Sequence, residues 1–193
     1  TEPHFYDIEC EARGEAIEKR DYRFDMQGKY AYYQAHKPVY EQDKAAGHAV
    51  RALYLYCGMI DVAKLEDNKR LLEVCHKLWK NITTRQMYIT GGVGPNYRGE
   101  RFTYDYDLYN SMSYNETCAS IALVMFAHRL LNDSPKGEYG DIMERCLYNN
   151  IRGGISLSGD RFYYSNPLTA VPEAYQNMIE DWSHLTLMRQ EWF

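Results

Sequence analysis

The stretch Glu116–Leu131, with the sequence ETCASIALVMFAHRLL, decides the fold class of this chain. Asn115, which directly precedes it, is of a residue type that commonly caps the N-terminus of a helix. The segment is apolar on nearly every side at helical spacing, which predicts a helix that other elements bury over most of its surface. A helix of this kind belongs inside a packed arrangement of further helices or sheets.

Further helices are predicted on both sides of this segment, because apolar residues recur there every three or four positions. They cover residues 4–20, 41–60, 67–82 and 138–152. Asp67 is the expected N-cap of the third, and the aromatic stretch 161–168 is consistent with a short strand or a loop lining a cleft. Amphipathic helices that alternate with more buried ones indicate helix pairs stacked in a ring. We therefore predict an all-α fold without an internal domain boundary.

The composition is that of a folded protein and argues against several partners. Of 193 residues, 45% are hydrophobic and 25% are charged, which is ordinary for a globular chain. The net charge of −5 and the lack of a basic run argue against a nucleic-acid partner. The longest apolar run, Ala119–Ala127, is too short to span a membrane.

The cysteine pattern favours reduced thiols. The five cysteines are Cys10, Cys57, Cys75, Cys118 and Cys146. They form no CxxC pair, and Cys57, Cys75 and Cys146 lie in amphipathic helical patterns, where a small buried residue is expected. An odd number without disulfide-like spacing favours a reducing compartment, so we expect a cytoplasmic protein.

The long segment 91–118 between predicted helices carries most of the candidate chemistry. It combines glycines and tyrosines with four carboxylates and a thiol: Glu100, Asp105, Asp107, Glu116 and Cys118. Acids supply proton transfer or metal ligation, tyrosines offer a flat face and a hydroxyl to sugar rings, and glycines let the backbone come close. Such a mixture indicates a functional loop on a rigid scaffold, at one mouth of the ring.

Glu116 and Cys118 open the predicted buried helix. Side chains two positions apart in a first helical turn can converge beyond the helix end, so a carboxylate and a thiolate here could share a zinc ion. The alternative is that Glu116 stabilises the helix N-terminus and Cys118 is a small buried residue. A complete zinc site needs about four ligands, so this pair alone does not define one.

Glu100, between Gly99 and Arg101, is a candidate general acid. The neighbouring arginine would lower its pKa and burial would raise it, and a solvated loop glutamate is the alternative. Asp105 and Asp107 alternate with tyrosines, so in an extended segment both acids face the same way. Sugar binding and bracing of the loop are both consistent with this pattern, and we favour bracing.

Three further residues are candidates for sugar contacts. His48 follows Gly47 within the predicted helix 41–60, as if the helix approached something closely. His36 lies in the sequence Gln-Ala-His-Lys, and Tyr164 lies in the aromatic stretch 161–168. A lone helical histidine is more often a satisfied core residue, and a tyrosine can simply pack.

Five separated motifs together resemble the β-L-arabinofuranosidases of glycoside hydrolase family 127. They are Tyr33–Val39 (YQAHKPV), Gly47–Ala52 (GHAVRA), Tyr88–Gly94 (YITGGVG), Phe102–Leu108 (FTYDYDL) and Glu116–Ser120 (ETCAS). The motifs keep their order and spacing from Tyr33 to at least Tyr164. The resemblance implies part of an (α/α)6 barrel, which in that family is accompanied by β-sandwich domains.

The resemblance also implies roles for individual residues. Glu116 and Cys118 match two of the four zinc ligands of the family, one glutamate and three cysteines. Glu100 matches the general acid/base, and His48 and Tyr164 match sugar-contacting positions. His36 lies in the first shared motif and is a further candidate for substrate binding. The expected substrate is a small carbohydrate with a terminal β-L-arabinofuranosyl unit.

The resemblance further implies a retaining mechanism, in which a zinc-bound cysteine attacks the sugar. That cysteine belongs to a Cys-Cys motif that residues 1–193 do not contain. We therefore expect these residues to be a partial catalytic barrel without the nucleophile and without the β-sandwich domains. Such a chain should be inactive alone, and its uncovered apolar faces should promote association, for example as a homodimer.

Other functional classes remain open at this point. A related barrel hydrolase or lyase could act on another sugar, and a catalytically silent sugar-binding or scaffold domain could share the fold. A helical-repeat interaction module fits the helices but leaves the carboxylate-rich loop unexplained.

Overall fold

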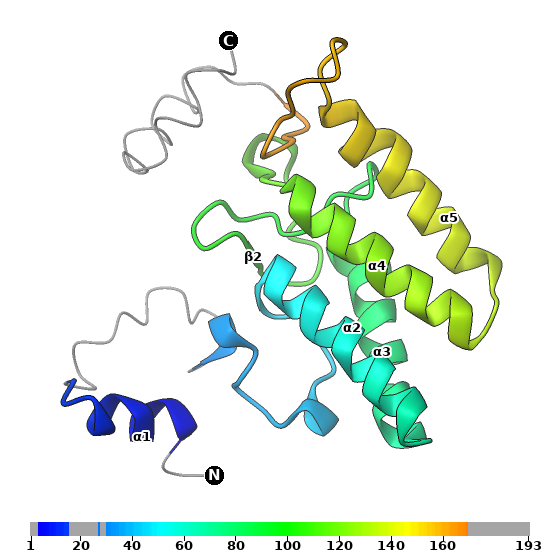
Figure 1. The fold of residues 1–193 in the computed structure, drawn as a ribbon. Helices are drawn as coiled ribbons and strands as arrows, with labels where there is room; N and C mark the ends of the chain where they lie inside the picture. Colours follow the sequence, from blue (N-terminus) through cyan, green and yellow to red (C-terminus); the bar gives the residue numbers. More distant parts are fainter. Residues whose placement is uncertain (1–3, 16–26, 28–29, 170–193) are drawn as a thin grey trace.

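The computed structural model describes residues 4–15, 27 and 30–169 and has an all-α fold, as the sequence predicts (Figure 1). The α-helices are α1 (Phe5–Ala12), α2 (Ala49–Leu65), α3 (Lys69–Asn81), α4 (Thr117–Asp133) and α5 (Gly137–Arg145). Short 3₁₀ turns are η2 (Ala31–Tyr33), η3 (Val39–Glu41), η5 (Asn110–Met112) and η7 (Arg152–Gly154), and π turns are η4 (Ile82–Gln86) and η6 (Cys146–Ile151). The two-residue strands β1 (Gly47–His48) and β2 (Arg101–Phe102) pair antiparallel.

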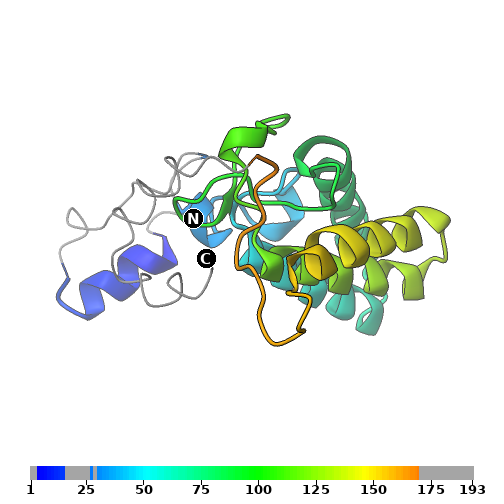
Figure 2. The same ribbon diagram turned by 90° about the horizontal axis from the view of Figure 1, so that it is seen from above.

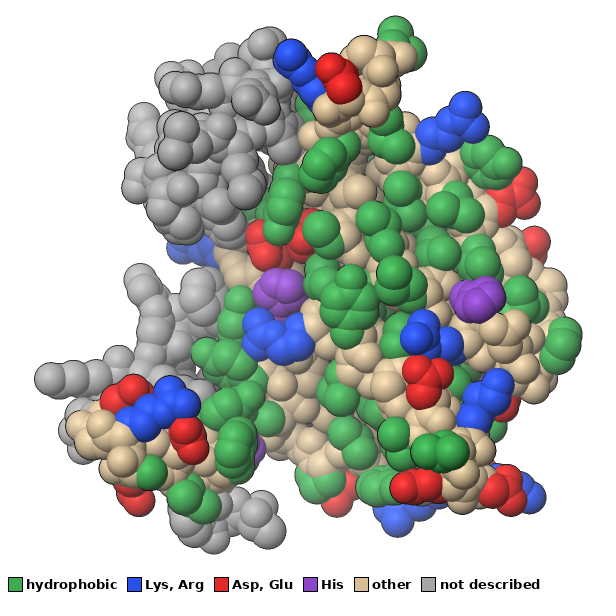
Figure 3. All heavy atoms as spheres, in the orientation of Figure 1, with side chains coloured by type: hydrophobic (Ala, Val, Ile, Leu, Met, Phe, Trp, Pro, Cys, Tyr) green, Lys and Arg blue, Asp and Glu red, His purple; other side chains and the backbone are tan. Residues whose placement is uncertain are grey.

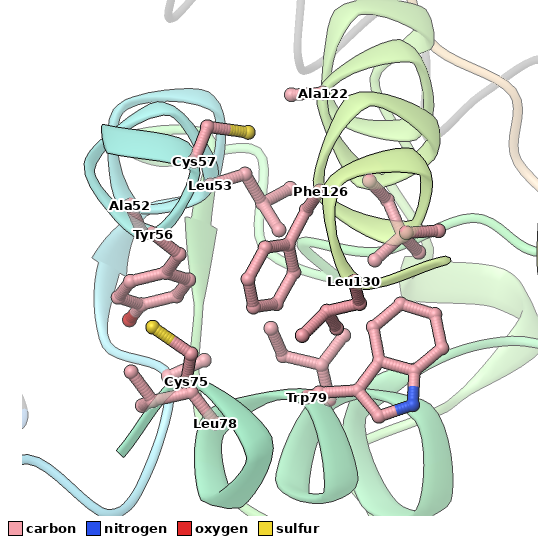
Figure 4. Packing of buried hydrophobic residues seen from close by; sticks show 14 of the residues in the cluster. Ala52, Leu53, Tyr56, Cys57, Cys75, Leu78, Trp79, Ala122, Phe126 and Leu130 are labelled. Atoms are coloured by element: carbon pink, nitrogen blue, oxygen red, sulfur yellow. The ribbon is translucent and has the colours of Figure 1, made fainter. Parts of the chain in front are cut away.

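Helix α4 lies at the centre of the helical layer. It contacts α2 on one side and α5 on the other, while α3 packs against α2. In the core, the Phe126 ring lies 5.7 Å from Tyr56 and 5.8 Å from Trp79, measured between ring centroids (Figure 4). Leu53 and Leu130 are fully buried beside them. Burial of this kind contributes about 1.5–3 kcal/mol per large apolar side chain, so these helices hold one another in place.

Helices α2 and α4 begin at the same end of the layer, as Figures 1 and 2 show. The connecting loops 87–116 and 152–169 meet at that end. Thr117 N, at the start of α4 and directly after the first loop, donates to the carbonyl of Tyr164 in the second loop at 2.9 Å. Ala49 N likewise donates to the Glu100 carbonyl at 2.8 Å. The N-termini of two helices therefore face the loop that carries the candidate acids.

The largest difference from the sequence-based expectation concerns helix 41–60, which begins at Ala49 and continues through Gly58 to Leu65. Gly47 prevents an earlier start, because it adopts a φ of +70° and pairs with Phe102. A Cβ atom at this position would lie 2.2 Å from the Ala31 carbonyl oxygen, so only glycine fits. His48 is consequently the N-cap of α2, and its predicted mid-helix position was wrong.

Other helix boundaries shift for identifiable reasons. Helix α1 ends at Ala12 rather than near residue 20, and residues 16–20 lie outside the described part of the chain. Asn68, not Asp67, caps α3 by accepting the Leu71 N–H at 3.1 Å. Helix α5 ends earlier than predicted because the chain continues into the π turn η6. Residues 161–168 form a loop with isolated bridges to two other segments.

Asp105 braces the long loop, as the sequence interpretation favoured. Its carboxylate accepts from Asn81 Nδ2 at 2.9 Å and from Arg85 Nη1 at 3.0 Å, and Lys44 Nζ lies 3.2 Å away. Burial acts to raise the pKa of Asp105, but the hydrogen bonds from Arg85, Asn81 and Lys44 outweigh it and hold the pKa below its ordinary value. The loop is thereby attached to α3 and its following turn.

The cysteine interpretation is also confirmed for the buried residues. The described cysteines form no disulfide with one another, and Cys57, Cys75 and Cys146 are buried among apolar side chains. Within the described residues, no helix combines the length and apolarity that crossing a membrane requires.

Candidate active site

Glu100 sits at the end of a tight turn that points its side chain towards the helix N-termini. Gly99 and Glu100 both adopt left-handed backbone, with φ values of +78° and +48°. A non-glycine residue in this region costs of order 1–3 kcal/mol, so the surrounding structure must hold it. It does so through the bridge between Asn96 and Arg101 and through the pairing of Arg101 with His48.

The Glu100 carboxylate accepts hydrogen bonds from Tyr114 and His48 and also interacts with the Tyr164 hydroxyl. Tyr114 Oη donates to Oε1 at 2.8 Å, and His48 Nε2 lies 3.2 Å from Oε2. Burial raises the pKa of Glu100, but these hydrogen bonds, led by the one from His48, outweigh it and hold the pKa below its ordinary value. The side chain is therefore poised as a carboxylate. The lowering comes from His48 and Tyr114, not mainly from the adjacent Arg101 that the sequence suggested.

His48 connects this carboxylate to helix α2. As the N-cap, its Nδ1 atom accepts the Arg51 backbone N–H at 3.3 Å. In a neutral imidazole, one ring nitrogen accepts and the other carries the proton. The cap therefore assigns the proton to Nε2, which donates to Glu100.

Glu116 is the N-cap of α4 and the second buried carboxylate of the site. Its side chain is buried, and its Oε2 atom has no hydrogen-bond partner among the described residues. Burial raises the pKa of Glu116 and the negative charge of Glu100 adds to this, while hydrogen bonds with Cys118 and Tyr164 act in the opposite direction. The two carboxylates thus have pKa values shifted apart, which is a feature of acid–base sites.

Cys118 is the second residue of α4, and its side chain lies next to that of Glu116. Burial raises the pKa of Cys118 to about 12, and the hydrogen bond with Glu116 and its charge reinforce this. Without a cation nearby, the side chain is a thiol at neutral pH.

Tyr164 closes the cluster from the loop after α5. Its hydroxyl interacts with both Glu100 and Glu116, and its ring centroid lies 6.4 Å from that of Tyr114. Burial raises the pKa of Tyr164, and the two carboxylates raise it further, so it is a hydrogen-bond donor.

The structure therefore brings five predicted residues together, namely Glu100, Glu116, Cys118, His48 and Tyr164. Figure 3 shows acidic side chains directly beside a histidine on one face of the molecule. His36 lies half-buried in the bend between η2 and η3. Tyr114 was missed from the sequence, although its position beside the N-cap motif of α4 was a usable signal.

Glu116 and Cys118 fit part of a zinc site. Carboxylate oxygen and thiolate sulfur are both zinc ligands, and the unpartnered Oε2 atom is free to bind a cation. Among the described residues, no group of three or more His, Cys, Asp or Glu side chains could hold a metal. This part of the chain thus supplies two donors, and a full tetrahedral site requires more.

The site combines two carboxylates whose pKa values are shifted apart with two tyrosine hydroxyls. Such a pair of carboxylates is typical of the glycoside hydrolase class. Comparison with known proteins agrees. The chain belongs to the beta-L-arabinofuranosidase GH127 catalytic domain family, whose match covers residues 10–193.

Individual relatives support this assignment. The chain is 46% identical over 165 residues to a non-reducing end beta-L-arabinofuranosidase of Bifidobacterium longum subsp. longum, covering 86% of this chain and 25% of that protein. A crystal structure of a GH127 beta-L-arabinofuranosidase from Geobacillus stearothermophilus T6 matches with a TM-score of 0.83 and 49% identity, over 90% of this chain and 27% of that one. A second solved GH127 beta-arabinofuranosidase matches with a TM-score of 0.71 and 46% identity, over 72% and 22%. The chain thus spans about a quarter of the length of these relatives.

Proposed function

We propose that the protein containing this chain is a retaining glycoside hydrolase that releases L-arabinose from β-L-arabinofuranosides. The observation that carries this proposal is the position of Glu100, held by His48 and Tyr114 beside the Glu116–Cys118 pair. Membership of the GH127 family and the names of the relatives support the substrate class.

In this proposal Glu100 is the general acid/base. It protonates the leaving oxygen in the first step and then removes a proton from the water that hydrolyses the covalent glycosyl–enzyme intermediate. The hydrogen bonds from His48 and Tyr114 favour the carboxylate that the second step needs. Burial favours the acid, so a substrate that excludes water from the site moves Glu100 towards the protonated form of the first step.

Glu116 and Cys118 are the proposed contribution of this chain to a zinc site. When bound, zinc would keep coordinating sulfur deprotonated near neutral pH. We propose that the nucleophile is a cysteine thiolate of the parent protein that lies outside residues 1–193, and that it attacks the anomeric carbon while the bond to the leaving oxygen breaks. On this basis residues 1–193 alone should not turn over substrate.

His48, Tyr164 and His36 are the proposed sugar contacts. Tyr164 and His48 already surround the Glu100 carboxylate, so an arabinofuranosyl unit at Glu100 would lie within reach of both. His36 is proposed only from its motif and its half-buried position in the neighbouring bend.

The test uses the full-length protein with a panel of p-nitrophenyl glycosides and follows the product anomer by NMR. We expect release of β-L-arabinofuranose first, from the β-L-arabinofuranoside alone, and a large loss of activity in Glu100→Gln. Glu144→Gln, on the exposed face of α5, is the matched control and should keep wild-type activity. Hydrolysis of another glycoside would favour a different barrel hydrolase, and no hydrolysis would favour a silent sugar-binding domain.

A further inference from the structure

Three asparagines, Asn115, Asn150 and Asn166, meet behind the candidate site, and we refer to them as the asparagine cluster. They come from the residue before the N-cap of α4, from the π turn η6 and from the loop after α5. Asn115 and Asn150 are buried, and Asn166 is half-buried. Asn115 directly precedes the site residue Glu116, and Asn166 follows the site residue Tyr164 by two positions.

The backbone carbonyl of Asn115 is the centre of this cluster. It accepts from Asn166 N at 3.2 Å, from Asn166 Nδ2 at 3.2 Å and from Asn150 Nδ2 at 3.4 Å. In return, Asn115 Nδ2 donates to the Asn166 carbonyl at 3.4 Å. Asn115 itself has a φ of +49°, a left-handed conformation that needs such support in a non-glycine residue.

The other hydrogen bonds of the cluster reach the first turn of α4. Asn150 Nδ2 donates to Ser120 Oγ at 2.7 Å, and Asn166 Nδ2 donates to Thr117 Oγ1 at 2.9 Å. Two amide side chains therefore hold both the turn that precedes Glu116 and the helical turn that follows it.

Two glycines make room for these amides. A Cβ atom on Gly92 would lie 2.7 Å from Asn115 Cγ, and one on Gly154 would lie 2.7 Å from Asn166 Oδ1. Neither glycine has a left-handed φ. Space for the asparagine side chains, rather than backbone conformation, is thus what requires glycine here.

We propose that Asn150 and Asn166 are positioning residues, which set the direction of Glu116 and Tyr164 relative to Glu100. The physical reason is connectivity. Glu116 directly follows Asn115 and forms a bridge with Ser165, and Tyr164 is two residues before Asn166. A change in the Asn166 amide therefore moves the carboxylate and the hydroxyl together. This proposal rests on the proposed function for its catalytic readout.

The test compares Asn166→Asp and Gly154→Ala with a control, Asn149→Asp, in the full-length protein. Asn166→Asp replaces the donating amide by an acceptor of the same shape. Gly154→Ala leaves Asn166 unchanged but displaces its side chain. Asn149, the exposed neighbour of Asn150, donates to the Arg145 carbonyl in its own turn, at 2.9 Å.

Three quantities are measured: kcat and KM on p-nitrophenyl β-L-arabinofuranoside, the zinc dissociation constant by chelator competition, and the crystal structure of each variant. We expect Asn166→Asp and Gly154→Ala to lower kcat and zinc affinity by about 10- to 100-fold, the usual effect of removing an outer hydrogen bond from a metal ligand, with KM changing less. Asn149→Asp should match the wild type.

Folded variants with wild-type kcat, zinc affinity and Glu116–Tyr164 geometry would overturn the proposal, whatever their melting temperature. If Asn166→Asp does not fold, Gly154→Ala decides. If the wild-type protein does not hydrolyse the substrate, the proposed function fails, and the crystal structures alone decide this inference. Displacement of Tyr164 from Glu116 in the variants would then support it, and an unchanged site would refute it.

Discussion

The Nε2 atom of His48 lies 3.2 Å from Oε2 of Glu100, while the Nδ1 atom of the same ring caps helix α2 by accepting the Arg51 N–H. One imidazole thus performs two tasks through its two nitrogens. The cap fixes which nitrogen carries the proton, and the proton serves the carboxylate. Helix α2 and the candidate acid/base are coupled through this single side chain.

Substitution of His48 separates the two tasks. Asparagine is a good N-cap but is too short to replace Nε2 at Glu100, so His48→Asn should keep the cap of α2 and lose only the hydrogen bond to Glu100. Because that bond lowers the pKa of Glu100, the pKa should rise in the variant. The alkaline limb of the kcat/KM profile, which reports loss of the proton that Glu100 gives to the leaving oxygen, should therefore move to higher pH. His48→Ala should show the same shift and be about 1 kcal/mol less stable than His48→Asn, because it also loses the cap. An unshifted profile in His48→Asn would contradict this coupling.

Tyr114→Phe should also raise the pKa of Glu100, because it removes the donor to Oε1 at 2.8 Å. Hydrogen bonds to charged groups contribute about 1.5–3 kcal/mol, so we expect a clear loss of stability near pH 7, where Glu100 is ionised. The loss should shrink as the pH falls and Glu100 becomes protonated. Urea unfolding at several pH values measures this, with the exposed Tyr148→Phe as control. A pH-independent loss would indicate packing alone.

Asp105→Asn should make the free energy of unfolding less dependent on pH in the acidic range. The folded-state pKa of Asp105 is lowered, so its contribution is present above the unfolded pKa, which is near 3.9 in model peptides, and is lost as the pH falls through the folded value. Removing the charge should therefore destabilise the protein at neutral pH and change little at pH 2. Asp61→Asn is the control, because Asp61 forms an exposed pair with Arg129. An equal loss of stability in both variants would contradict the proposed bracing role of Asp105.

Glu116→Gln should make the Cys118 thiol more reactive in metal-free protein. The charge of Glu116 raises the pKa of Cys118, so its removal should lower that pKa and increase the thiolate fraction at a given pH. We expect several-fold faster alkylation of Cys118 at pH 8, followed by mass spectrometry, and unchanged alkylation of Cys10. Slower or equal alkylation of Cys118 would show that Glu116 does not act on this thiol.

The sequence predicted the parts of the fold that depend on local periodicity. Helix α4 was found within two residues at each end because its apolar pattern is long and unbroken. The start of α2 was misplaced because it depends on the pairing of Gly47 with Phe102, more than fifty residues away. A window along the chain does not contain that information.

The candidate site, like the fold, could be predicted only where the signal is local in the sequence. Glu100, Glu116 and Cys118 stood out by residue type and motif, but the partners that set their pKa values did not. Tyr114 reaches Glu100 only because the loop folds back, and Asn150 reaches Ser120 only through the π turn η6. These contacts join segments that are distant in sequence, so spacing alone could not reveal them.

The most direct test of the central claim, that Glu100 is the acid/base of a retaining hydrolase, is azide rescue of Glu100→Ala in the full-length protein. The substrate is p-nitrophenyl β-L-arabinofuranoside, whose leaving group needs little protonation. We expect slow turnover without azide, a marked acceleration with it, and β-L-arabinofuranosyl azide as the product, because azide intercepts the covalent intermediate without needing a base. Wild-type activity in Glu100→Ala, no rescue, or the α-azide as product would contradict the assignment.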